Sequence, residues 1–138
     1  MEAPIFLAAD FANVDGTGKL NIIGAFNRLN VAQFPYVHPA MYLAIRLVIE
    51  LGEFNKEKTL KVTLFSEDAE EVWTTGDIKF TVPLPLEGKA TEFHPIIGIQ
   101  QLKFDHPGRF EFRLFINDDS KGETPLDVVK ADQPSQGQ

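Results

Sequence analysis

The sequence predicts an all-β protein, an antiparallel two-sheet β-sandwich of about eight strands in the immunoglobulin-like or C2-like style. Apolar and polar side chains alternate with a period of two in most segments, and none shows a convincing helical period. Short clusters of Gly, Pro, Asp and Asn separate these segments. A composition that is 43% hydrophobic and includes 12 Phe supplies the apolar area for one core. A closed barrel is the second choice.

The first four predicted strands cover residues 4–12, 19–31, 40–50 and 58–65. Segment 4–12 is apolar on both faces, as is typical of a covered strand. Asp10 interrupts this segment, and we expect it to be buried with its carboxylate accepting backbone N–H bonds. Segment 40–50 alternates most regularly, so we expect one of its faces in the core, formed by Met41, Leu43, Ile45, Leu47 and Ile49.

Four further strands are predicted at residues 72–82, 93–104, 109–116 and 124–131. Segment 93–104 changes phase, because Ile97 and Ile99 occupy odd positions whereas Leu102 and Phe104 occupy even ones. One extra residue at Gln100–Gln101, a β-bulge, would keep all four side chains on the buried face.

The stretch NVDGTGKL, residues 13–20, combines glycines with a lysine, as phosphate-binding loops do. The P-loop pattern G-x-x-x-x-G-K-[ST] nevertheless fails, because Lys19 is followed by Leu20 and by a strand in place of a helix. The dinucleotide pattern G-x-G-x-x-G fails at Asn21. Asp-Gly between two apolar runs predicts a β-hairpin turn, with Gly16 supplying a positive φ.

Charge and cysteine content exclude several classes of function. A net charge of −7 with no basic cluster argues against nucleic acid and anionic membranes as partners. The chain has no Cys, which excludes disulfides, thiolate zinc sites and cysteine nucleophiles. The N-terminus lacks the basic region of a signal peptide, so we expect a cytoplasmic protein. We expect one domain, residues 1–131, and a disordered tail, residues 132–138.

Several stretches resemble a family of small uncharacterised bacterial proteins. They are LAADFANVDGTGKLNIIGAFNRL, LAIRLVIELGEFNKEKTLKVTLFSEDAEEV and LKFDHPGRFEFRLFIND, and the resemblance extends over about positions 5 to 130. The family shares a D-F-A…G-K-x-N-x-I-G opening and a P-G-R-[FY]-x-F strand. Its members often carry a Cys where this chain has Ala9, which argues against a required thiol. The resemblance implies a compact sandwich and a bacterial source, and no catalytic residue.

All three histidines precede a proline, which places them at turns or strand edges. If successive strands alternate in direction, five side chains gather at one end of the sandwich as a conceivable zinc or acid–base cluster: His38, Glu67, Asp68, Asp105 and His106. No ligand spacing such as H-E-x-x-H supports this, so we favour solvent-facing turn histidines.

Acidic loops give an alternative function, a calcium- or carbohydrate-binding sandwich. Asp15, Asp118 and Asp119 are the candidate metal ligands, because calcium takes six to eight oxygen ligands. Asp, Asn and Gly are also the residues that turns require, and we favour that interpretation. A hydrolase ranks third, since no serine lies in a G-x-S-x-G motif.

Five residues outside the core pattern are candidates for partner binding, as a patch on a sheet face: Tyr42, Arg46, Trp73, Arg113 and Phe115. Strand 40–50 or strand 109–116 offers an alternative, which is edge-to-edge pairing in a homodimer. The sequence therefore predicts a non-catalytic protein-interaction or adaptor module, without a cofactor, whose partner is another protein or a second copy.

Overall fold

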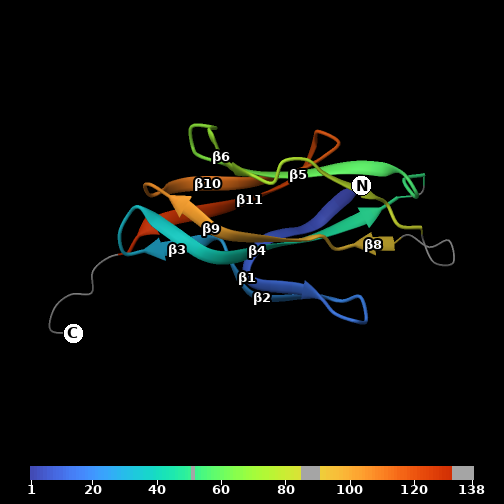
Figure 1. Cartoon of the computed structure of the whole chain (residues 1–138), viewed down its shortest axis with the longest axis horizontal. Helices are drawn as coiled ribbons and strands as arrows, with labels where there is room; N and C mark the ends of the chain where they lie inside the picture. The colour runs from blue at the N-terminus through green and yellow to red at the C-terminus, as the bar shows by residue number, and fades with distance from the viewer. Residues whose placement is uncertain (51, 85–90, 132–138) are drawn as a thin grey trace.

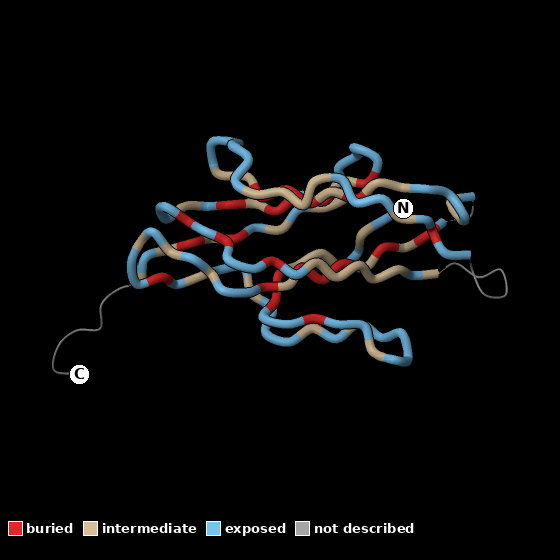
Figure 2. Tube along the Cα trace, in the orientation of Figure 1, coloured by how far each residue is buried: buried red, intermediate tan, exposed pale blue. Residues whose placement is uncertain are grey.

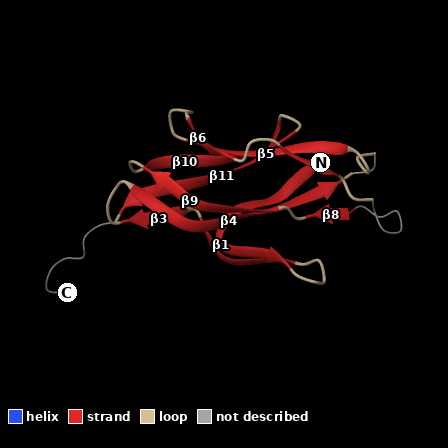
Figure 3. Ribbon diagram, in the orientation of Figure 1, coloured by secondary structure: helices blue, strands red, loops and turns tan. Residues whose placement is uncertain are grey.

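The computed structural model describes residues 1–50, 52–84 and 91–131, and the predicted tail lies outside this range. The described residues form strands and no helix, arranged as two packed sheets (Figures 1 and 3), which confirms the all-β sandwich. The strands are β1 (Glu2–Val14), β2 (Leu20–Phe26), β3 (Arg28–Val31), β4 (Tyr36–Ile49), β5 (Glu57–Phe65), β6 (Glu71–Thr74), β7 (Ile78–Thr81), β8 (Thr91–Phe93), β9 (Ile96–Phe104), β10 (Gly108–Ile116) and β11 (Asp119–Lys130).

The first sheet has the order β2-β1-β4, and both β8 and β9 pair with the far side of β4. The second has the order β3-β11-β10-β5, and both β6 and β7 pair with β5. The strands β1, β4 and β9 correspond to A, B and E of the immunoglobulin fold, and β5, β10 and β11 to C, F and G. One pair departs from the predicted antiparallel pattern, because β3 runs parallel to β11.

Three of the eight predicted strands are each divided in two by local backbone chemistry. Segment 19–31 divides at Asn27, where the chain passes from the first sheet to the second. Segment 72–82 divides at Gly76, whose φ is +68°. Segment 93–104 divides at His94–Pro95, since Pro cannot donate to a strand ladder. Because β6 and β7 both run antiparallel to β5, Gly76 forms no hairpin. The expected alternation of strand direction fails earlier in the chain, since β2 and β4 both run antiparallel to β1.

The core lies between the sheets and follows the predicted alternation (Figure 2). Met41, Leu43, Ile45, Leu47 and Ile49 of β4 are all fully buried. They face the inner side chains of the second sheet, which include Leu60, Val62 and Leu64 of β5, Phe110, Phe112 and Leu114 of β10, and Leu126 and Val128 of β11. Burial of this apolar area is the main term that stabilises the fold.

The phase change in β9 occurs as predicted, but not through an extra residue. Ile99, Leu102 and Phe104 are buried and Ile97 packs against the core. The register with β4 is nevertheless unbroken, from Tyr36↔Phe104 to Ala44↔Ile96. Gln101 takes a left-handed conformation, with φ of 58°, and this inverts the side-chain alternation. The predicted bulge is therefore wrong, and a left-handed residue replaces it.

β1 pairs with β4 only as far as Ala9↔Tyr42, and beyond that point it pairs with β2 alone. Residues 11–23 form a hairpin, here called the arm, which runs below the first sheet and roughly parallel to it in Figure 1. At its base Gly24 has φ of +70°, and the Asp10 carboxylate lies where a Cβ on Gly24 would be. Asp10 is exposed, so its predicted burial is wrong.

The tip of the arm confirms the hairpin turn predicted for the glycine-rich stretch. The Asp15 N–H donates to the Lys19 carbonyl at 3.0 Å, and the Gly18 N–H donates to the Asp15 carbonyl at 3.0 Å. Gly18, rather than Gly16, supplies the positive φ, at +83°. The Asp15 carboxylate accepts from the Thr17 hydroxyl and from the backbone N–H groups of Lys19 and Thr17, and these bonds lower its pKa to about 2.

Candidate protein-interaction surface

The solvent-side face of the first sheet includes three mostly apolar cross-strand rows, here called the outer face, which the row Val48–Glu92 follows with a carboxylate. The register aligns the rows across β1, β4 and β9 as Ala9–Tyr42–Gly98, Leu7–Ala44–Ile96 and Ile5–Arg46. Only Arg46 in these rows carries a charge. Solvent-side faces of antiparallel sheets are usually polar, so an apolar composition here is unusual, and the side chains of these rows are buried or half-buried rather than fully exposed.

Two alanines show that the outer face is already closely packed. Ala9 and Ala44 are fully buried, yet neither belongs to the core cluster between the sheets. Tyr42 accounts for part of this covering, because its ring lies 3.3 Å from where a Cβ on Gly98 would be. The edge of the Phe11 ring meets Tyr42, with 5.4 Å between ring centroids. The Tyr42 ring is therefore packed against Gly98 and Phe11 beside these two buried alanines.

A polar cluster borders the outer face at the β8 side. The Arg46 Nε donates to His94 Nε2 at 3.0 Å and lies 3.4 Å from the Glu92 carboxylate. The acceptor role of Nε2 requires His94 to be neutral, with its proton on Nδ1. Burial and the neighbouring Arg46 charge lower the pKa of His94. The sequence placed His94 at a turn without assigning it a partner, because Arg46 is 48 residues away in the chain.

The arm adds exposed apolar side chains beside the outer face. Phe11 and Ile23 lie directly opposite each other and are 42% and 62% exposed, and Val14 is 40% exposed. The exposure of Phe11 and Ile23 is not evident from the sequence, because segment 4–12 has the pattern of a covered strand and Ile23 lies within the predicted strand 19–31. They lie beyond the point where β1 stops pairing with β4, next to the bend at Gly24.

The solvent-side face of the second sheet is charged, unlike the outer face of the first sheet. Its outward side chains include Lys61, Glu111, Arg113 and Glu123. Arg113 pairs with Glu111, and its guanidinium lies over the Phe65 ring at 5.3 Å. Lys61 likewise lies over the Phe115 ring at 5.3 Å. Arg113 and Phe115 thus have partners within the sheet, as on an ordinary solvated face.

The five predicted partner-binding residues therefore do not form one patch. Tyr42 and Arg46 lie together on the outer face of the first sheet. Arg113 and Phe115 lie on the second sheet, on the opposite side of the sandwich. Trp73 packs edge-on against Phe112 and belongs to the packing around the core. The single-patch prediction is wrong because alternation shows which side of its own strand a residue takes, but not which sheet the strand joins.

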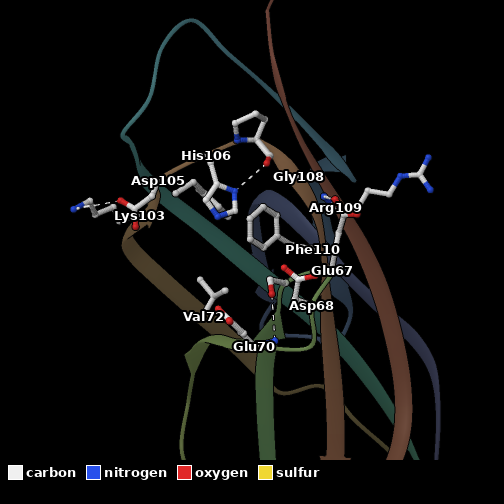
Figure 4. A pocket seen from close by; sticks show the side chains of 13 residues that line it. Glu67, Asp68, Glu70, Val72, Lys103, Asp105, His106, Gly108, Arg109 and Phe110 are labelled. Atoms are coloured by element: carbon white, nitrogen blue, oxygen red, sulfur yellow. Dashed lines mark hydrogen bonds and ion pairs between the residues drawn. The ribbon is translucent and has the colours of Figure 1, made fainter.

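One end of the sandwich brings together most of the predicted histidine–carboxylate cluster. Glu67, Asp68, Asp105 and His106 line an open hollow of about 590 Å³ (Figure 4). His38 is elsewhere, hydrogen-bonded through Nδ1 to the Tyr36 hydroxyl at 2.8 Å. Figure 4 shows the Arg109 guanidinium directed away from the hollow.

The polar groups around this hollow have structural partners. Glu67 accepts from the Arg109 N–H at 3.0 Å, and Asp105 pairs with Lys103 at 3.5 Å. His106 stacks on Phe110, and its Nδ1 lies 3.0 Å from the Pro107 carbonyl. Within the ranges that the structure describes, no three His, Asp or Glu side chains are placed to share a metal ion. Of the four side chains, Glu67, Asp105 and His106 thus have structural partners, and Asp68 is exposed to solvent.

The calcium candidates are also separated. Asp15 lies in the β1–β2 turn of the first sheet, whereas Asp118 and Asp119 lie at the β10–β11 hairpin of the second. Asn117 and Asp118 have positive φ values of 49° and 68°, as hairpin turns of this length require. The predicted pairing of these loops is wrong, and turn geometry explains the residue types.

The fold and surface define a class, an immunoglobulin-like β-sandwich with one apolar and one charged outer face. The chain belongs to a family of unknown function (DUF6941), whose model matches residues 4–129. No curated protein matches the sequence. None of the described segments is a helix of the length and hydropathy needed to cross a membrane.

A solved structure with a similar fold is Pseudomonas fluorescens alkylpurine DNA glycosylase AlkC bound to DNA containing an abasic site analog. The match covers 93% of this chain with a TM-score of 0.55 and 7% sequence identity. It covers 30% of the glycosylase, so this chain spans less than a third of that protein's length. At this identity the likeness shows a shared fold alone.

Proposed function

We propose that this chain is a non-catalytic protein-interaction module of the bacterial cytoplasm, and that its partner binds the outer face of the first sheet. The observation that carries the proposal is the composition of that face, three cross-strand rows with Arg46 as the one charged side chain. The bacterial source is proposed from the family resemblance.

Tyr42 and Arg46 are the proposed anchors. Aromatic residues and Arg dominate the energetics of protein interfaces, because each combines a large contact area with a polar group. Tyr42 is half-buried at the centre of the face, and Arg46 is held by His94 and Glu92 at its border. Both side chains are therefore positioned before a partner arrives, which reduces the entropy lost on binding.

Binding to a purified partner tests the proposal. The partner is first captured on the immobilised wild-type chain from a cell that naturally contains this protein, then purified and titrated against variants by calorimetry. We expect Tyr42→Ala with Arg46→Ala to weaken the affinity by about 30-fold or more, the effect of losing one hot spot. Arg113→Ala with Phe115→Ala is the matched control on the other sheet and should stay within about twofold. An equal loss of affinity in the two double variants would contradict the proposal.

A further inference from the structure

We propose that the free edge of β2 pairs with the same edge of a second copy. The two strands would run antiparallel about a twofold axis and join the first sheets of both copies into one sheet. This surface is a strand edge, separate from the outer face used in the proposed function. The predicted edges, segments 40–50 and 109–116, are excluded, because β4 and β10 are both paired on two sides.

β2 is the least protected edge strand that the structure describes. Its seven residues, LNIIGAF, include no charged side chain and no proline, and it pairs with β1 alone. Edge strands of soluble proteins are normally short, interrupted or charged, because a free ladder of N–H and C=O groups recruits other strands. The other edges that the structure describes follow this rule: β3, β6 and β7 have four residues each, β8 has three, and β9 carries Lys103.

The distribution of charge favours a second copy at this edge. Each chain carries a net charge of −7 and 20 acidic side chains, so two copies repel over most of their surfaces. Residues 16–49, which include β2, contain Lys19, Arg28 and Arg46 and no Asp or Glu. The paired β2 strands themselves therefore contribute no carboxylate, although Asp10 of β1 lies against Gly24. Antiparallel pairing also brings the tip of each arm, with Asp15, toward the Arg28 end of the other β2.

The apolar contact at this edge centres on Ile23, the middle residue of β2 and 62% exposed. Twofold pairing would cover it with Ile23 of the second copy, because such an interface is self-complementary. A single strand edge is small compared with the roughly 1,200–2,000 Å² of stable interfaces. We therefore expect a reversible dimer whose population rises with protein concentration.

Sedimentation velocity over a concentration series tests the pairing. Wild type should shift from monomer to dimer, and added salt should promote the dimer by screening the repulsion between copies. Ile23→Lys should remain monomeric at concentrations where wild type is dimeric. Ile78→Lys is the matched control, an isoleucine 40% exposed on the edge strand β7, and it should dimerise like wild type.

Circular dichroism of both variants verifies that each is folded. A wild type that stays monomeric at every concentration would overturn the inference. So would an Ile23→Lys variant that dimerises like wild type, which would locate any dimer at another edge such as β9. Because Tyr42 and Arg46 report on partner binding and Ile23 reports on self-pairing, either claim can fail without the other.

Discussion

Single residues determine where the arm leaves the sandwich. Gly24 takes a left-handed φ of +70°, and the Asp10 carboxylate occupies the space next to its Cα. Any other residue at position 24 would strain the backbone and collide with Asp10. Neither effect is visible from the sequence, in which Gly24 is one glycine within an otherwise apolar strand.

We expect Gly24→Ala to lower the free energy of unfolding by about 1–3 kcal/mol, the cost of backbone strain at such a site. Urea denaturation measures the change. Gly16→Ala is the control, because its φ is not left-handed and no atom lies within 4 Å of the added Cβ. That control should change stability by less than about 0.5 kcal/mol. Equal effects of the two substitutions would show that the bend at Gly24 is not as described.

His94 gives the outer face a dependence on pH. Its pKa is lowered in the folded chain by burial and by Arg46, whereas the unfolded chain titrates near the ordinary value of 6.5. The unfolded state therefore binds more protons just below that pH, and stability must fall as the pH decreases through this window.

We expect His94→Gln to reduce the loss of stability between about pH 7 and pH 5, since Gln does not titrate. Thermal melting at a series of pH values measures this. His106→Gln is the control, because His106 is exposed at a turn and stacks on Phe110. If the melting temperatures of wild type and His94→Gln changed in parallel with pH, the pH dependence could not be assigned to His94.

At the scale of strands, local chemistry explains both what could be predicted and what could not. The period of two in segments 40–50 and 109–116 predicted β4 and β10 within a few residues, because both are central strands with one apolar face. The same period did not predict that three strands are divided, at Asn27, Gly76 and His94–Pro95, although a turn residue lies at each division. A strand that changes sheet keeps its alternation, so the pattern alone does not reveal the change.

The inversion at Gln101 shows the same limit. The phase change was visible in the sequence, but its mechanism depended on the partner strand. Opposite Gln101 lies Pro39, which has no N–H to contribute to a ladder. An extra residue and a left-handed residue both invert the alternation, and only the unbroken register with β4 distinguishes them.

Two of the predicted binding residues should differ sharply in their effect on stability. Trp73 packs against Phe112 at the margin of the core, so we expect Trp73→Ala to cost about 2–4 kcal/mol. Phe115 lies on the outer side of β10 under Lys61, so Phe115→Ala should cost less than about 1 kcal/mol. Chemical denaturation of both variants measures the difference. If Phe115→Ala lowered the free energy of unfolding more than Trp73→Ala did, the assignment of Trp73 to the core side and Phe115 to the solvent side would be wrong.

At the scale of the whole molecule, the two outer faces define the functional proposal. One is charged and internally paired, and the other is apolar and bordered by an arm with exposed Phe11 and Ile23. The sequence correctly predicted that Tyr42, Arg46, Arg113 and Phe115 point away from the core. Their division between two faces depended on strand order, which arises from contacts between residues far apart in the chain.

Site-specific photocrosslinking tests the central claim, that a protein partner contacts the outer face of the first sheet. A photoreactive phenylalanine analogue is placed at position 42 in one chain and at position 115 in another, and both are irradiated in cells that contain the natural partner. We predict a defined protein adduct from position 42 and none from position 115. An adduct from position 115 alone would contradict the account.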